Sequence, residues 1–216
     1  MCYNSVINAW GWSKAPGKAV RAWAVYQRIV DRSNAGVSSV RPDIVGLNSV
    51  LNACAFTDVR SEVDRADALR IAVEAFEFVT ASKPKYGRPN HISFGTVLMV
   101  LVNLLPPGRD EGEDESRERL AQNLFWQCCR GGHLSGMVFS QVFKAVSDET
   151  LLELFGEAAV RSPETGKVVI DRRKVPSEWS KHADEAGMRG FRKSRGSKKR
   201  PMPEVTKQQL SRNRRQ

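Results

Sequence analysis

The sequence has no long hydrophobic run and no paired cysteine motif. No stretch approaches 18 consecutive apolar residues, so we expect no transmembrane helix and no membrane insertion. The four cysteines, Cys2, Cys54, Cys128 and Cys129, show no CxxC spacing. A disulfide or zinc framework is therefore not expected, and the cysteine pattern fits a reducing compartment.

Recognisable catalytic motifs are also missing. The three histidines, His91, His133 and His182, lie far apart, with no acid or thiol partner at helical spacing, and there is no phosphate loop or dinucleotide fingerprint. The acidic segment 109–119 is expected to be a solvated loop that leads into a helix, where nothing would hold its carboxylates around a metal. We therefore predict that the protein is not an enzyme and needs no metal and no cofactor.

Excess charge is confined to the C-terminal end of the chain. The formal net charge is +10, and residues 189–216 hold eleven Lys or Arg against one acid, Glu204. The rest of the chain has 23 basic and 23 acidic residues, a net charge of zero. Binding by the body must therefore depend on how its charges are arranged and not on their sum.

Helical periodicity dominates what remains. Apolar residues recur at i, i+3, i+4 and i+7 in residues 3–10, 47–54, 94–101 and 139–146, and again in 22–29, 72–79, 121–128 and 151–158. The first set begins at intervals of 44, 47 and 45 residues. This pattern predicts an all-α fold, an α-solenoid of antiparallel helix pairs. HEAT and armadillo arrays have similar periods, so length alone does not choose the family.

Turn signals divide the chain into segments. The helical-repeat array is predicted over residues 1–159, with pairs at about 1–43, 44–90, 91–135 and 136–159. Residues 160–187 are expected to hold a turn, a short extended segment and one closing helix at 176–186, whose Trp179 would cover the end of the core. The composition of residues 188–216 predicts a basic disordered tail. No capping element precedes Tyr3, so we expect the chain to be a fragment of a longer array.

The units also share residues. The first unit reads YNSVINAWGWSK, then AWAVYQRI after a turn, and closes with RPD. The second reads GLNSVLNAC, AVEAFEFV and RPN, and two weaker units follow with SFGTVLMVL and AQNLFWQC, then VFSQVFKAV and LLELFGEA. These stretches resemble the pentatricopeptide repeat over about residues 1–159, although inserts make the units longer than those of that family.

The resemblance implies binding of single-stranded RNA, one base per repeat, by a few side chains at fixed places. The base-reading residues it implies are Asn4, Asp43, Asn48, Asn90, Gly95, Ser135 and Ser140. The base-wedging residues are Val45, Ile92 and Met137. By the pairing preferences of the family, Asn4 with Asp43 resembles a uridine reader and Asn48 with Asn90 a cytidine reader, whereas Gly95 with Ser135 matches nothing well.

Plainer roles remain open for the same residues. An Asn or Asp at a helix start is often a cap, and the three apolar residues would also suit packing between repeats. In the tail, Lys193, Arg195, Lys198, Lys199 and Arg200 are predicted to contact phosphates, but a solvated end is the alternative. The run KSRGSKKRP would also fit a nuclear-localisation signal.

Two classes of function follow from this pattern. The resemblance implies a sequence-selective RNA-binding adaptor, a monomer that acts with other protein factors in the RNA processing, stability or translation of a mitochondrion or plastid. The alternative is a protein-binding helical scaffold whose basic tail makes non-specific contacts with nucleic acid or membrane. An electropositive groove beside Asn4 and Asn48 would favour the first class, and an apolar or acidic groove the second.

Overall fold

The structure, a computed structural model, describes residues 3–37, 39–81 and 86–183, and these are mostly helical. The α-helices of the described residues are α1 (Tyr3–Trp12), α2 (Lys18–Asn34), α3 (Ile44–Ala55), α4 (Glu62–Ala81), α5 (His91–Leu104), α6 (Glu111–Gly131), α7 (Gly136–Ala145) and α8 (Asp148–Phe155). Two helices thus lie in each of the four segments that the turn signals delimit.

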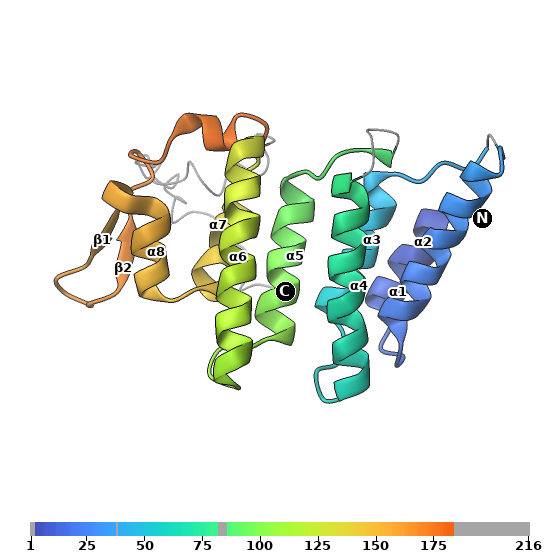
Figure 1. Ribbon diagram of the computed structural model, residues 1–216, viewed down its shortest axis with the longest axis horizontal. Helices are drawn as coiled ribbons and strands as arrows, with labels where there is room; N and C mark the ends of the chain where they lie inside the picture. The colour runs from blue at the N-terminus through green and yellow to red at the C-terminus, as the bar shows by residue number, and fades with distance from the viewer. Residues whose placement is uncertain (1–2, 38, 82–85, 184–216) are drawn as a thin grey trace, which may run out of the picture.

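The helices are arranged in two layers. The odd-numbered helices α1, α3, α5 and α7 pack side by side in chain order and are called the A layer here. The helices α2, α4 and α6 form a second row that covers one side of the A layer and is called the B layer here (Figure 1). Helix α8 follows beyond α6, at the C-terminal end of the two rows. The helices α1, α3 and α5 each pack against the B helix that follows in the chain, and α7 packs against α8 through the rings of Phe139 and Phe155.

The core lies between the two layers and is built from the predicted apolar faces. Leu47, Val50, Leu51 and Cys54 of α3 are fully buried, as the i, i+3, i+4, i+7 spacing predicts. Phe76 of α4 packs edge-on against the A layer, with its ring centroid 5.3 Å from that of Phe94 in α5, which lies in the next predicted unit. The core is therefore continuous from one predicted unit to the next.

Buried basic side chains close the C-terminal ends of α1, α5 and α7. The ammonium group of Lys18 donates to the carbonyl of Gly11 at 3.3 Å, and the guanidinium of Arg65 donates to that of Leu104 at 2.9 Å. In α6, Arg117 donates to the carbonyls of Leu105 and Ala145 at 3.1 and 2.9 Å. The last carbonyls of a helix have no partner within it and carry partial negative charge, so these cations satisfy both needs.

The acidic segment 109–119 is helical over most of its length, so the prediction of a solvated loop is wrong. The side chain of Asp110 caps α6 by accepting from the backbone N–H of Glu113 at 3.0 Å. The carboxylate of Glu113 then pairs with Arg65 at 2.8 Å, and that of Asp114 pairs with Arg117. Acids in a first helical turn are stabilised by the helix dipole, and here they also neutralise two buried arginines.

The C-terminal end of the described chain departs from the all-α prediction. Strand β1 (Ala159–Arg161) pairs antiparallel with β2 (Val168–Ile170), and α8 ends at Phe155. The expected closing helix at 176–186 is a single 3₁₀ turn, η3 (Ser177–Ser180), within the described residues. Trp179 nevertheless covers the end of the core as predicted, with its ring centroid 5.6 Å from that of Phe125.

Candidate nucleic-acid interface

The first predicted base-reading pair meets at the start of α3. Asp43 caps this helix, and its Oδ1 accepts from the backbone N–H of Gly46 at 2.7 Å. The side-chain amide of Asn4 in α1 donates to both carboxylate oxygens, at 3.2 and 3.1 Å. A Cβ atom at Gly46 would lie 2.7 Å from Oδ1 of Asn4, so a glycine is needed for this close approach. The cap and the inter-helix contact therefore use the same carboxylate.

The α2 helix supports this cap from behind. The hydroxyl of buried Tyr26 donates to the backbone carbonyl of Asp43 at 3.3 Å. Burial raises the pKa of Tyr26, and the nearby Asp43 carboxylate raises it further. The phenol therefore stays protonated at neutral pH and keeps its hydrogen bond to the residue that begins the pair.

The second pair repeats this arrangement at the start of α5. Oδ1 of Asn90 caps the helix by accepting from the N–H groups of Ile92 and Ser93 at 3.0 and 3.1 Å. Asn48 in α3 accepts from the Ser93 hydroxyl at 2.8 Å and places its amide nitrogen 3.5 Å from Oδ1 of Asn90. Within the described residues, Nδ2 of Asn90 donates no hydrogen bond. The second pair therefore keeps a donor for a ligand.

The third predicted pair, Gly95 and Ser135, is not accessible to a base. The side chain of Ser135 is fully buried and caps α7 by accepting from the backbone N–H of Val138 at 3.3 Å. Gly95 is covered by Met137, whose Cγ would lie 2.8 Å from a Cβ at that position. Neither residue presents a polar group to solvent, so base reading at this pair has no support in the geometry. Ser140 is exposed, and across the described part of the chain no polar partner faces its side chain.

Two of the predicted wedging residues are exposed on the same face. Val45 is 61% exposed and Ile92 43% exposed, and both are the second residue of their helix. Asn48 lies one turn beyond Val45 in α3, and Asn90 comes two residues before Ile92. Each member of the Asn48 and Asn90 pair thus has an exposed apolar residue two or three positions away in the sequence. Met137 differs, since it is half-buried over Gly95.

The A layer carries almost no charge. In α1, α3, α5 and α7 the only Lys, Arg, Asp or Glu is Lys144, and the only His is His91. Beside Asn4, this face carries the Asp43 carboxylate, so it is not electropositive. The rest of its surface consists of amides, hydroxyls and single apolar side chains.

Positive charge lies instead at the edge of this face. Arg41 and Arg88 each come two residues before a cap of the first two pairs, Asp43 or Asn90, and both are exposed. Neither makes an ion pair within the residues that the structure describes. The recurring RP dipeptide in RPD and RPN was the available signal for these two cations.

The three histidines are far apart in the sequence, but the fold brings them near one another. The ring centroids of His133 and His182 are 5.9 Å apart, because the segment after η3 folds back onto the end of α6. Burial lowers the pKa of His133, as does the proximity of His182 and His91. Among the residues that the structure describes, Nδ1 of His133 is buried without a hydrogen-bond partner. In the described ranges, no group of three or more His, Cys, Asp or Glu side chains is placed to hold a metal ion.

The remaining predictions about binding concern the tail and the membrane. Lys193, Arg195, Lys198, Lys199 and Arg200 lie outside the described residues. None of the described helices combines the length and the apolar composition needed to cross a membrane. Comparisons of the chain with models of protein families, with curated proteins and with solved structures give no match in any of the three.

Proposed function

We propose that the chain is an α-solenoid of the pentatricopeptide-repeat kind and acts as a sequence-selective adaptor for single-stranded RNA, in the RNA processing, stability or translation of a mitochondrion or plastid. The A layer is its binding face. The proposed order of the bases is a uridine at Asn4 and Asp43, followed by a cytidine at Asn48 and Asn90. The two layers of helices and the shared residues of the units support the repeat assignment.

The observation that carries this proposal is the pairing of predicted reading residues from distant parts of the sequence. Asn4 and Asp43 are 39 residues apart, and Asn48 and Asn90 are 42 apart, yet the side chains of each pair meet at equivalent helix starts. A base that enters the second pair can place its polar edge against the amides and its faces against Val45 and Ile92. Single-stranded RNA is commonly read in this way, through the Watson–Crick edge of an unstacked base.

The chemistry of each pair matches a different pyrimidine. Asp43 is an acceptor only and suits the N3–H donor of uracil, whereas Nδ2 of Asn90 is a donor and suits the N3 acceptor of cytosine. Oδ1 of Asp43 accepts from both Gly46 and Asn4, but among the described residues Oδ2 accepts only from Asn4 and keeps one lone pair for a base. Asn90 caps its helix through Oδ1, so Nδ2 keeps both of its hydrogens.

Selection from a random single-stranded RNA pool tests the proposal. The wild-type chain is compared with Asn48→Ala and with a tail variant in which Lys193, Arg195, Lys198, Lys199 and Arg200 are replaced by Gln. We expect the wild type and the tail variant to enrich RNAs with a shared U-C element, and Asn48→Ala to lose the preference at its second base. Enrichment that disappears in the tail variant and never shows a shared element would contradict sequence reading by the helices.

The low charge of the A layer also supports a second function, a scaffold that binds a protein segment. Such a face lacks the positive groove that phosphate contacts favour, and amides with single apolar side chains also suit a peptide. The same selection separates the two functions, because a scaffold would enrich no RNA through its helices.

A further inference from the structure

A hollow of about 770 Å³ lies at the other end of the A helices from the reading pairs, between the turn that follows α1 and the turn that follows α3. Its volume is typical of small-molecule sites, which are about 300–1,000 Å³. Two large aromatic side chains border it with little cover, since Trp12 is 78% exposed and Phe56 54% exposed. Met99 of α5 contributes a third apolar side chain.

The two aromatic residues occupy equivalent places in neighbouring units. Each comes nine residues after the apolar residue that opens its helical pattern, which is Tyr3 for Trp12 and Leu47 for Phe56. In both units the reading asparagine, a second asparagine and the aromatic residue follow at intervals of four, as do Asn48 and Asn52 of α3 and Phe56, the C-cap of that helix. Residues four apart share a helix face, so this face runs from the reading pairs to the hollow.

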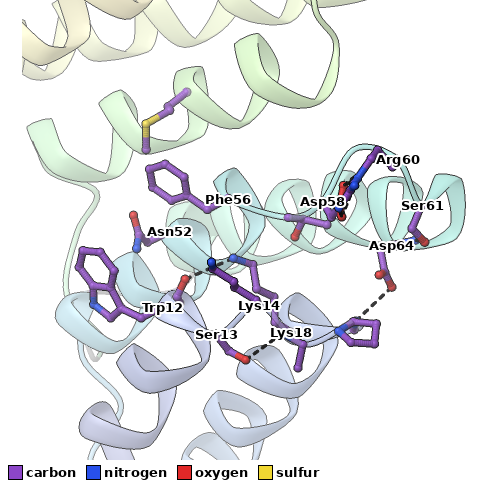
Figure 2. A pocket seen from close by; sticks show the side chains of 16 residues that line it. Trp12, Ser13, Lys14, Lys18, Asn52, Phe56, Asp58, Arg60, Ser61 and Asp64 are labelled. Carbon is purple, nitrogen blue, oxygen red and sulfur yellow. Dashed lines mark hydrogen bonds and ion pairs between the residues drawn. The ribbon is translucent and has the colours of Figure 1, made fainter.

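Most polar groups of the hollow are already paired. Asp64 accepts from the backbone N–H of Gly17 at 3.1 Å, and Arg60 pairs with Asp58 at 2.6 Å (Figure 2). The ammonium group of Lys18 is bound to a backbone carbonyl in the same wall. The Gly17–Asp64 contact links the α1–α2 turn to α4, whereas the Arg60–Asp58 pair lies within the α3–α4 turn and Lys18 links α2 to α1.

Three groups remain for a ligand. Neither the amide of Asn52 nor the indole N–H of Trp12 makes a hydrogen bond within the described residues, and Lys14 there makes no ion pair. In the view of Figure 2, the Asn52 side chain lies between the rings of Trp12 and Phe56. Aromatic faces, an amide with free donor and acceptor, and an unpaired cation match the three parts of a nucleotide: the base face, the base edge and the phosphate.

We propose that this hollow binds one nucleobase of the RNA strand by stacking on Trp12 or Phe56, with Asn52 against the base edge and Lys14 near a phosphate. This inference rests on the proposed function. The rise of a helix puts Phe56 about 12 Å along α3 from Asn48, so the stacked base belongs to a different nucleotide from the one read by the Asn48 and Asn90 pair. The hollow adds affinity, because every base offers a face for stacking.

Fluorescence of 2-aminopurine tests the proposal in the full-length chain. Single-stranded RNAs with a U-C element carry one 2-aminopurine, placed at successive flanking positions. Stacking on an aromatic ring would quench the fluorophore at one position in the wild type, and Trp12→Ala with Phe56→Ala would remove this quench. The double variant would also bind RNA at least about fivefold more weakly, since alanine substitution commonly removes a stacking contribution of that size. Trp12→Phe would retain most of the affinity.

Val63→Ala is the matched control, because Val63 is an exposed apolar residue of α4 outside the hollow. It should leave affinity and quenching unchanged. If the double variant binds as tightly as the wild type while Asn48→Ala still relaxes base choice, the hollow is not a base site and the reading function stands. If the wild type binds no RNA, the proposed function itself fails, and this inference fails with it.

Discussion

The side-chain amide of Asn4 donates to both carboxylate oxygens of Asp43, although the two residues lie 39 positions apart in the chain. The corresponding contact in the next unit joins Asn48 to Asn90, so the two reading pairs differ by one functional group, a carboxylate in place of an amide. Both groups also cap a helix. The difference between uridine and cytidine preference is therefore proposed to reside in a single atom of the cap side chain.

Exchange of this group should exchange the preferred base. Asp43→Asn is expected to change the first preference from uridine to cytidine, and Asn90→Asp to change the second from cytidine to uridine, each by about 1–3 kcal/mol of discrimination. Asp and Asn are equivalent as N-caps, so neither change should lower the melting temperature. Binding of base-substituted oligonucleotides measures the preference.

The control for this exchange is Asp110→Asn. Asp110 is also an N-cap, but it begins α6 in the B layer and lies away from the reading pairs. It should leave base preference unchanged. If the base preference does not change when Asp43 and Asn90 are exchanged, both residues act only as helix caps and do not select a base.

Salt dependence should locate the phosphate contacts of the body. Because the A layer is nearly uncharged, we expect Arg41 and Arg88 to supply much of the body's electrostatic contribution. Arg41→Gln with Arg88→Gln should reduce the slope of log K against log salt by about 1.4, since each phosphate contact to a single strand contributes about 0.7. Base preference should not change. Arg28→Gln, an exposed change in α2, serves as the control, and an equal loss of slope there would refute the assignment.

Removal of a buried arginine should destabilise the fold strongly. Arg117→Met leaves the carbonyls of Leu105 and Ala145 and the carboxylate of Asp114 without their cation, and should lower the free energy of unfolding by about 3–5 kcal/mol. Urea unfolding measures this change.

The comparison for that measurement is Arg60→Met. Arg60 pairs with Asp58, and the hydrogen bonds of Arg60 lower the pKa of Asp58 to about 2, but both side chains are exposed. The exposed pair should contribute little to the free energy of unfolding, because water and salt screen it. Similar losses for the two variants would contradict the role given to burial.

Mild acid should weaken the fold through His133. Its pKa is lowered in the folded state by burial and by the two neighbouring histidines, so the unfolded chain takes up the proton first as the pH falls below about 6.5. Stability should therefore fall from that pH down to the lowered pKa. We expect a lower urea midpoint at pH 5.5 than at pH 7.5, and a smaller difference in His133→Gln. The same difference in both proteins would assign the effect to other groups.

The sequence predicted the helices in which the spacing of apolar residues repeats over two turns or more. The faces of the helices followed from apolar spacing because each run spans two turns or more, as in residues 47–54. In place of the hairpin at 159–170, the sequence predicted only a turn and a short extended segment, because strands of three residues are too short to show alternation of apolar and polar residues. The acidic segment was misread because its partners, Arg65 and Arg117, meet it only in three dimensions.

Predictability of the candidate site divides along similar lines. The meeting of Asn4 with Asp43 and of Asn48 with Asn90 was expected from the resemblance to a repeat family, and no property of a single residue indicated it. The hollow was missed because an exposed aromatic residue and a core aromatic residue look alike in sequence. Only the structure distinguishes Trp12 from Trp23, which is buried in α2.

The two buried arginines also join elements that belong to different units. Arg65 of α4 reaches a carbonyl at the end of α5 and the carboxylate of Glu113 in α6, and Arg117 of α6 reaches the ends of both α5 and α7. An array held only by contacts between neighbours can fray from one end. Here the unfolding of one helix pair would leave a buried arginine of the neighbouring pair without its hydrogen-bond and ion-pair partners. The second, third and fourth units should therefore melt in one cooperative transition.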